Sequence, residues 1–279
     1  MNGHATFVIP AMTAGIADPG GAPPRAGERR GQHRVERVMG TVVTIDVRDP
    51  GVDPGAVDAA LAYLHDIDAR FSPFRPESEV SRLARGEIRE DECSADVRHV
   101  LALCEDLRRT SDGYFDIRGH RPDGRLDPCG MVKGWAVEEA SRILEAAGAN
   151  DYAINAGGDV IASGGPAAGR PWRVGIRHPH KADRLAAVLA VRDRAVATSG
   201  TYERGEHIRD PHTGRPPAGL LSLSVVGPSL TWADAYATTG FAMGLAGIGW
   251  VARHVGYGAC GITADGRVLW TAELDRLLA

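Results

Sequence analysis

Residues 197–240 read ATSGTYERGEHIRDPHTGRPPAGLLSLSVVGPSLTWADAYATTG. The stretch holds His207, a turn of sequence Asp-Pro-His-Thr-Gly at 210–214, and then a run rich in β-forming residues. It ends in an alanine-rich segment that we expect to be helical. Because Asp234 and Thr238 are four positions apart there, this spacing puts a carboxylate and a hydroxyl on one face of the helix.

The pairing of Asp234 with Thr238 is typical of a site for a hard cation. Both side chains offer oxygen ligands, and ligation by oxygen alone favours Mg²⁺ over zinc. A simpler interpretation is also open, because an Asp near the start of a helix is often its N-cap, and a Thr four residues later often lies on the surface. His207 stands three residues before Asp210, so the chain also brings an imidazole near a carboxylate.

The composition indicates a globular protein whose partners are small ligands or proteins. Its 279 residues, 43% of them hydrophobic, can bury one large core or two coupled lobes. The net charge of −4 and the mixing of signs give no basic stripe, which argues against a nucleic-acid partner. The four cysteines form no CxxC pair, so the sequence predicts neither a structural zinc nor a disulfide framework, and a reducing compartment fits best.

Residues 1–33 are rich in Gly, Ala, Pro and Arg, and we expect them to form a disordered leader. This segment has no cysteine that could carry a lipid. No later segment has 18 uncharged apolar residues in a row, so we expect no stable membrane insertion. The predicted location is the cytoplasm.

Strands and helices alternate after the leader without a long linker. Hydrophobic periodicity predicts helices over Pro54–Phe71, Asp96–Ser111, Lys133–Ala147 and Trp232–Leu245. It predicts strands over Val42–Val47, Tyr152–Ile161, Trp172–Ile176, Ala186–Val191 and Leu221–Val226. Strict βαβ alternation is missing, which favours an α+β fold with mixed or antiparallel sheets and flanking helices.

Two glycine-containing motifs stand out, although the sequence has neither a GxGxxG fingerprint after a predicted strand nor a GxxxxGK[ST] loop. The motif Asn-Ala-Gly-Gly-Asp at 155–159 would let a ligand or another backbone come close, or it is simply a tight turn. The second motif, Gly-Met-Val-Lys-Gly at 130–134, holds Lys133. The chain has 30 arginines but only two lysines, so this lysine indicates a need for a compact ammonium or has persisted by chance.

Eight motifs together give the chain a family resemblance. They are Met39-Gly40-Thr41, the run FSPFRPESEVSRL at 71–83, Gly113-Tyr114-Phe115-Asp116, Asp127 with Gly130, Lys133 and Gly134, residues 155–159, Ala197-Thr198-Ser199-Gly200, His207 with the turn at 210–214, and Ala233-Asp234 with Thr238. In this order they resemble the ApbE family of FAD:protein FMN transferases. The resemblance implies a two-lobed, single catalytic unit over residues 34–279.

The resemblance also implies a substrate, a metal and a set of binding residues. FAD, the substrate, would contact Met39, Phe74, Tyr114, Phe115, Asp116, Asp127, Lys133 and the backbone of Ile208. Mg²⁺ would be held by Asp234, Thr238 and the backbone carbonyl of Gly130. The implied reaction transfers FMN from FAD to a Ser or Thr hydroxyl of an acceptor flavoprotein that carries a flavinylation motif, and it releases AMP.

His207 is the candidate general base, because a neutral imidazole can take the proton of the acceptor hydroxyl at neutral pH. Asp210 could orient His207 or close the turn that follows it. The chain departs from the family pattern at Phe74, where Tyr is usual, at Pro128-Cys129, and in the short segment between Asp116 and Asp127. Two rival functions remain, an FAD pyrophosphatase that gives free FMN and AMP and a non-catalytic FAD-binding protein.

Overall fold

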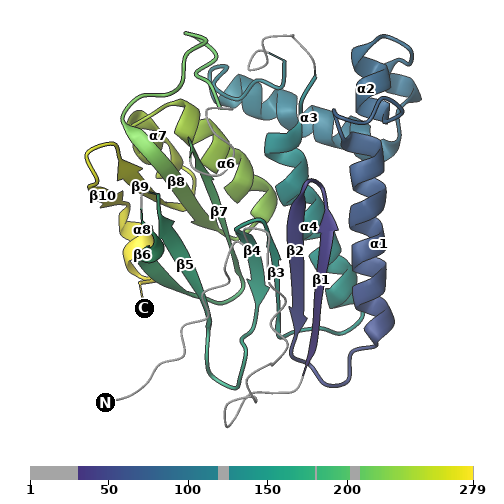
Figure 1. The fold of residues 1–279 in the computed structure, drawn as a ribbon, viewed down its shortest axis with the longest axis vertical. Coiled ribbons are helices and arrows are strands. Elements are labelled where there is room, and N and C mark those ends of the chain that lie inside the picture. Colours follow the sequence, from purple (N-terminus) through teal and green to yellow (C-terminus); the bar gives the residue numbers. More distant parts are fainter. Residues whose placement is uncertain (1–30, 119–125, 180, 202–207, 279) are drawn as a thin grey trace.

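An eight-stranded antiparallel sheet forms the centre of the structure, a computed structural model that describes residues 31–118, 126–179, 181–201 and 208–278. The strand order is β1-β2-β3-β4-β7-β8-β9-β10. The strands are β1 (Gln32–Val38), β2 (Thr41–Val47), β3 (Tyr152–Ala156), β4 (Asp159–Ser163), β7 (Arg194–Gly200), β8 (Leu220–Gly227), β9 (Gly258–Thr263) and β10 (Val268–Trp270). Together with the helices, this sheet confirms the predicted α+β class (Figure 1).

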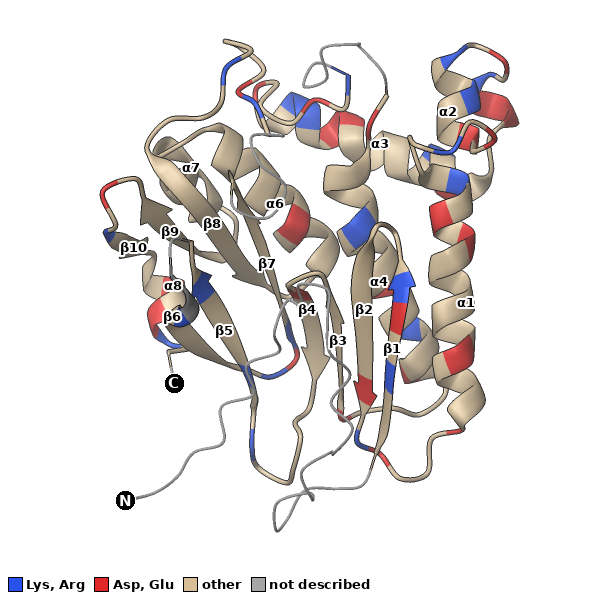
Figure 2. Ribbon diagram, viewed as in Figure 1, with Lys and Arg blue, Asp and Glu red and all other residues tan. Residues whose placement is uncertain are grey.

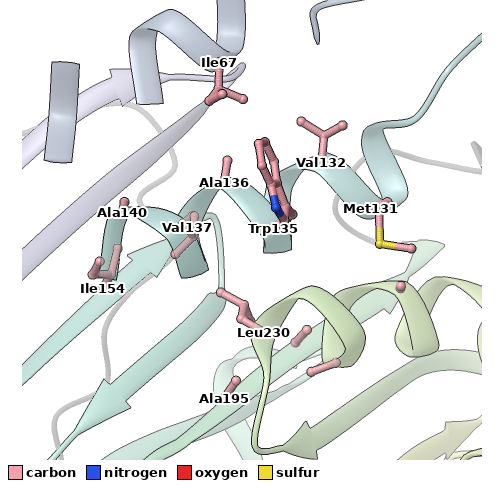
Figure 3. Packing of buried hydrophobic residues seen from close by; sticks show 14 of the residues in the cluster. Ile67, Met131, Val132, Trp135, Ala136, Val137, Ala140, Ile154, Ala195 and Leu230 are labelled. Carbon is pink, nitrogen blue, oxygen red and sulfur yellow. The ribbon is translucent and has the colours of Figure 1, made fainter. Parts of the chain in front are cut away.

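Helices cover one face of the sheet. They are α1 (Pro54–Phe71), α2 (Glu79–Ala84), α3 (Ala95–Thr110), α4 (Cys129–Ala146), α6 (Leu230–Ala242) and α7 (Ala246–Val251), with a 3₁₀ turn at Glu90–Glu92. The short α8 (Ala272–Asp275) contacts β9 and places Leu274 in the buried cluster on the other face. Helix α4 contacts both α1 and α6. Its buried residues lie between Ile67 of α1 and Leu230 of α6, with Val132 and Trp135 on the side of Ile67 (Figure 3).

The opposite face of the sheet is covered by a second, two-stranded sheet of β5 (Trp172–His178) and β6 (Lys181–Val191). Alternate residues of these strands, among them Trp172, Val174 and Leu189, pack with Val160, Val226 and other residues in a second buried cluster. The large sheet is therefore buried on both faces over its central strands. Charged residues gather instead on α1, α2 and α3 (Figure 2).

Most predicted elements are present, and their bounds need correction. Helix α1 has the predicted bounds, whereas α4 begins at Cys129, four residues before the predicted start. The prediction of one strand over Tyr152–Ile161 is wrong, because the chain reverses at Gly157 and Gly158 and forms the antiparallel hairpin β3–β4. Both glycines have positive φ, +62° and +104°, which allows this tight reversal.

Strand β1 begins at Gln32, so two residues of the segment predicted as a leader belong to the sheet. The rest of that segment, residues 1–30, lies outside the described residues. None of the helices described by the structure is long and apolar enough to cross a membrane.

Candidate functional site

Helix α6 holds the predicted carboxylate–hydroxyl pair. Its N-cap is Ser229, whose hydroxyl accepts a hydrogen bond from the N–H of Trp232 at 3.4 Å, so the alternative that Asp234 caps the helix is wrong. Asp234 lies in the second turn with only 3% of its surface exposed. Thr238 follows one turn later and is half-buried, so the two side chains share one face of α6.

Two glycines let α4 approach this face of α6 closely. The backbone N–H of Gly134 donates a hydrogen bond to Oδ2 of Asp234 at 3.0 Å. A Cβ added to Gly134 would lie 2.5 Å from the carbonyl oxygen of Leu230, and a Cβ added to Gly130 would lie 3.2 Å from Cγ2 of Thr238. The absence of side chains at these two positions therefore sets the spacing between the helices.

Lys133 supplies the positive charge at the contact between the two helices. Its ammonium forms an ion pair with Oδ2 of Asp159 and lies 3.6 Å from Oδ1 of Asp234. Asp159, at the start of β4, is buried and also accepts a hydrogen bond from the N–H of Thr198 at 2.9 Å. The cluster is thus one ammonium between two buried carboxylates, each held by a backbone N–H.

The surroundings disfavour the ionised form of Asp234. Burial raises the pKa of Asp234 to about 7, the Lys133 ammonium opposes this shift, and the neighbouring Asp159 carboxylate adds to it. Two negative carboxylates share a single ammonium, so the site carries an excess of negative charge when both are ionised. Such a site favours the binding of a further cation.

The hydroxyl of Thr238 connects α6 to the sheet. Its Oγ1 lies 3.2 Å from Oγ of Ser199 in β7, within hydrogen-bonding distance. Ser199 belongs to the Ala-Thr-Ser-Gly motif quoted above, whose Thr198 also holds Asp159. Strand β7 therefore contacts the site twice. Ser199 meets the metal candidate Thr238, and Thr198 holds Asp159, the ion-pair partner of Lys133.

The segment that precedes α4 holds three predicted FAD residues, of which Phe115 lies beside Gly130. Phe115 is buried, and its Cε2 would lie 3.4 Å from a Cβ on Gly130. Asp127 donates its backbone N–H to the carbonyl of Ile117 at 2.8 Å, and its Oδ1 accepts from the N–H of Cys129 at 3.1 Å. Oδ1 of Asp116 accepts from the N–H of Arg118 at 2.8 Å. Residues 119–125, between these points, lie outside the described residues.

The turn at 210–214 lies against Tyr114. The rings of Tyr114 and His212 meet edge to face, with centroids 4.6 Å apart. Asp210 accepts from the N–H of His212 at 2.9 Å and from the hydroxyl of Thr213 at 3.0 Å, so both of its carboxylate oxygens bond within the turn. This arrangement corresponds to the turn-closing interpretation of Asp210. His207 lies outside the described residues.

The other predicted FAD residues lie in three separate segments of the chain. Met39 lies in the β1–β2 turn and has a positive φ of 55°. Thr41, at the end of this turn, lies next to Gly157 of the Gly-Gly turn. Ile208 packs against the main core. Phe74 lies in the loop between α1 and α2 with 75% of its surface exposed. The structure therefore brings Gly130, Lys133, Asp234 and Thr238 together, with Phe115 beside Gly130.

One residue of the cluster is absent from the predicted site. Asp159 is the ion-pair partner of Lys133, whereas its motif indicated a tight turn, or an approach point for a ligand at which Asp159 is an acceptor. The sequence signal that could identify it is an acidic residue directly after the Gly-Gly pair. Among the described residues, no group of three or more His, Cys, Asp or Glu side chains could hold a metal ion, so a metal here needs hydroxyl and carbonyl oxygens as well.

Comparison with known families gives one clear match. A sequence model described as the ApbE family matches residues 39–121 and 117–260, which together include every described residue of the Asp234 cluster. A protein from Escherichia coli K12 named FAD:protein FMN transferase is 26% identical over 83% of this chain and 66% of its own length. A protein of the same name from Rhodobacter capsulatus is 36% identical over 57% of this chain and 32% of its own length.

Solved structures share the fold. The flavin transferase ApbE from Vibrio cholerae superposes with a TM-score of 0.77 at 23% identity, covering 89% of this chain and 99% of its own. An ApbE protein from Thermotoga maritima also gives 0.77 at 22% identity, covering 90% of this chain and 100% of its own. The chain spans less than two thirds of the length of the curated relatives named above.

Proposed function

Because the chain belongs to the ApbE family, we propose that it transfers FMN from FAD to a Ser or Thr hydroxyl of an acceptor protein. In this reaction the acceptor oxygen bonds to the phosphorus of the FMN half, the bond from that phosphorus to the AMP half breaks, and AMP leaves. The relatives from E. coli and R. capsulatus carry the name of this activity. The acceptor class and the release of AMP are our proposals.

The observation that carries the proposal is the contact between α4 and α6. It collects a buried carboxylate, a hydroxyl and an ammonium in one place, through Asp234, Thr238 and Lys133. Phosphoryl transfer needs positioning and charge neutralisation more than covalent help from the enzyme. Oxygen ligands for a cation next to a fixed ammonium supply both requirements.

The donor set fits Mg²⁺. Asp234 gives a carboxylate and Thr238 a hydroxyl, both hard oxygens. The N–H of Gly134, which in a regular α-helix faces the carbonyl of Gly130, also donates to Asp234. A carbonyl oxygen has two lone pairs, so the Gly130 carbonyl can serve as a third oxygen ligand. When bound, Mg²⁺ would neutralise negative charge on the pyrophosphate.

Each residue of the cluster has its own role in the proposed reaction. Asp234, Thr238 and Gly130 hold the cation, and the Gly134 N–H orients the Asp234 carboxylate. Asp159 orients the Lys133 ammonium, which would neutralise negative charge on the phosphate oxygens. His207 would accept the proton of the attacking hydroxyl.

Mass spectrometry of an acceptor protein tests the proposal. The chain is incubated with FAD, Mg²⁺ and an acceptor that contains a Ser/Thr flavinylation motif, and a matched reaction contains EDTA. We expect the acceptor to gain the mass of FMN with an equal amount of AMP, and only when Mg²⁺ is present. Free FMN with an unmodified acceptor would show a pyrophosphatase instead, and FAD that stays intact would show a carrier.

A further inference from the structure

Glu138 of α4 binds the beginning of helix α6. Its Oε2 accepts hydrogen bonds from the Ser229 hydroxyl at 2.6 Å and from both the N–H and the hydroxyl of Thr231 at 2.8 Å. The Glu138 side chain is only 13% exposed, and its other oxygen meets Arg142 at 3.1 Å. A single carboxylate oxygen thus collects three donors from the first turn of the helix that carries Asp234.

This contact is a strong restraint on the start of α6. The first N–H groups of a helix have no partner within the helix, and a negative charge at that end is favoured by the helix dipole. Hydrogen bonds to a charged carboxylate are stronger than bonds between neutral groups. Ser229 extends the contact, because its hydroxyl also caps Trp232. The start of α6 is therefore fastened to a different helix.

Glu138 is one of three contacts at regular spacing. Gly130, Gly134 and Glu138 are four positions apart and lie on one face of α4. Gly130 meets Thr238, Gly134 meets Asp234, and Glu138 meets Thr231, so the partners run backwards along α6. The helices are antiparallel at this contact. A shift of α6 along its axis would therefore alter the contact of Glu138 with Thr231 and, at the same time, the positions of Asp234 and Thr238 relative to α4.

We propose that Glu138 is a positioning residue for the metal site. Its carboxylate fixes the axial position of α6 against α4, and this position sets how Asp234 and Thr238 face the Gly130 carbonyl. Glu138 itself acts through α6 and contacts neither the metal nor FAD. The inference rests on the proposed function, because it concerns the same Mg²⁺ site.

Calorimetric titration of the full chain with Mg²⁺ alone, after treatment with EDTA and dialysis, tests this role without any turnover. Loss of a residue that orients metal ligands typically weakens metal affinity by roughly 10- to 100-fold. We expect Glu138→Ala to raise the Kd for Mg²⁺ within this range. Glu138→Gln keeps the shape and one acceptor oxygen, so it should recover part of the affinity.

Two matched variants separate positioning from charge and from stability. Glu139→Ala removes the same charge from the neighbouring position of α4, where the side chain pairs with Arg142. Asp53→Ala removes a carboxylate cap from α1, where Asp53 accepts from the N–H of Gly55 at 2.9 Å. Both should bind Mg²⁺ as the wild type does, even where thermal melts show a loss of stability.

The outcomes are distinct. Wild-type affinity in a folded Glu138→Ala protein would overturn the positioning role and leave the proposed function intact. If Glu138→Ala does not fold, Glu138→Gln decides, and an affinity for Mg²⁺ equal to that of the wild type would then overturn the role. A wild-type chain that binds no Mg²⁺ at all would contradict the metal assignment in the proposed function and the positioning role with it.

Discussion

The backbone N–H of Gly134 lies 3.0 Å from Oδ2 of Asp234, although the two residues are 100 positions apart in the chain. This bond orients the only charged side chain among the proposed metal ligands. It requires glycine, because a Cβ at position 134 would lie 2.8 Å from Cβ of Asp234 and closer still to the Leu230 carbonyl. In the Lys-Gly pair at 133–134, Lys133 therefore supplies a positive charge to the two carboxylates, and Gly134 leaves the space that lets α6 pack closely against α4.

Gly134→Ala should separate α4 from α6. Inserting a methyl group into a packed contact costs about 1–3 kcal/mol of unfolding free energy, and here it also lengthens the bond to Asp234. We expect a lower midpoint of urea unfolding together with weaker binding of Mg²⁺. A suitable control is Gly249→Ala in α7, where a Cβ meets nothing within 4 Å. The control should gain up to about 1 kcal/mol, since alanine favours a helix more than glycine does.

Asp234→Asn should abolish the response to Mg²⁺. The substitution keeps the size of the side chain and removes the charge, which leaves a cation with neutral oxygens and water. In the wild type we expect Mg²⁺ to raise the Tm, because a ligand that binds only the folded state stabilises it. This rise should disappear in Asp234→Asn, along with the release of AMP from FAD.

Thr238→Val is the comparison variant for Asp234→Asn. It removes a neutral ligand and the contact with Ser199, so its effect on AMP release should be smaller. If Asp234→Asn released AMP at the wild-type rate in the presence of EDTA, the metal assignment would be wrong.

Lys133→Met should leave the Asp159 and Asp234 carboxylates without their shared ammonium. Removing one partner from a largely buried ion pair costs about 3–5 kcal/mol, because the remaining charge stays buried. We expect a lower Tm, part of which Mg²⁺ should restore, and slower turnover of FAD. Thermal melts with and without Mg²⁺ measure the first effect.

Asp159→Asn separates the two contributions of Lys133. It keeps the acceptor for the N–H of Thr198 and lets Lys133 pair with Asp234 alone. Its loss of stability should therefore be smaller than that of Lys133→Met. Unchanged stability and unchanged FAD kinetics in Lys133→Met would show that the reaction does not need this lysine, as the chance interpretation holds.

Local signals in the sequence predicted the elements that carry the site but few of the contacts between them. Periodicity and an Asp-Pro start are strong over Pro54–Phe71, so this helix was predicted with its observed bounds. The four-residue spacing of Asp234 and Thr238 likewise placed both on one helix face. The start of α4 has little local signal, because Cys129, Gly130 and Val132 all have low helix propensity.

Contacts between distant residues have no local signature. Glu138 and Thr231 are 93 positions apart, and Asp159 meets a lysine from a different layer of the fold. In the sequence only the Gly-Gly pair marks the β3–β4 reversal. The tight-turn interpretation of residues 155–159 is confirmed, whereas the apolar residues on either side of the pair favour a single strand. The motif order was more informative than any of these patterns, since it indicated the family that the comparisons confirm.

His207→Ala tests where the proton of the acceptor hydroxyl goes. His207 precedes Ile208, which packs against the core, and the turn at 210–214, which lies against Tyr114. If His207 is the general base, the variant should still bind FAD and Mg²⁺ but transfer FMN more slowly by roughly 10²- to 10⁴-fold. Single-turnover transfer rates, set beside thermal melts with and without FAD, separate chemistry from binding. A parallel loss of stability and FAD affinity would point to a hydrogen bond within the turn that ends at Gly214. Near-normal transfer by the folded variant would mean that another group or water takes the proton.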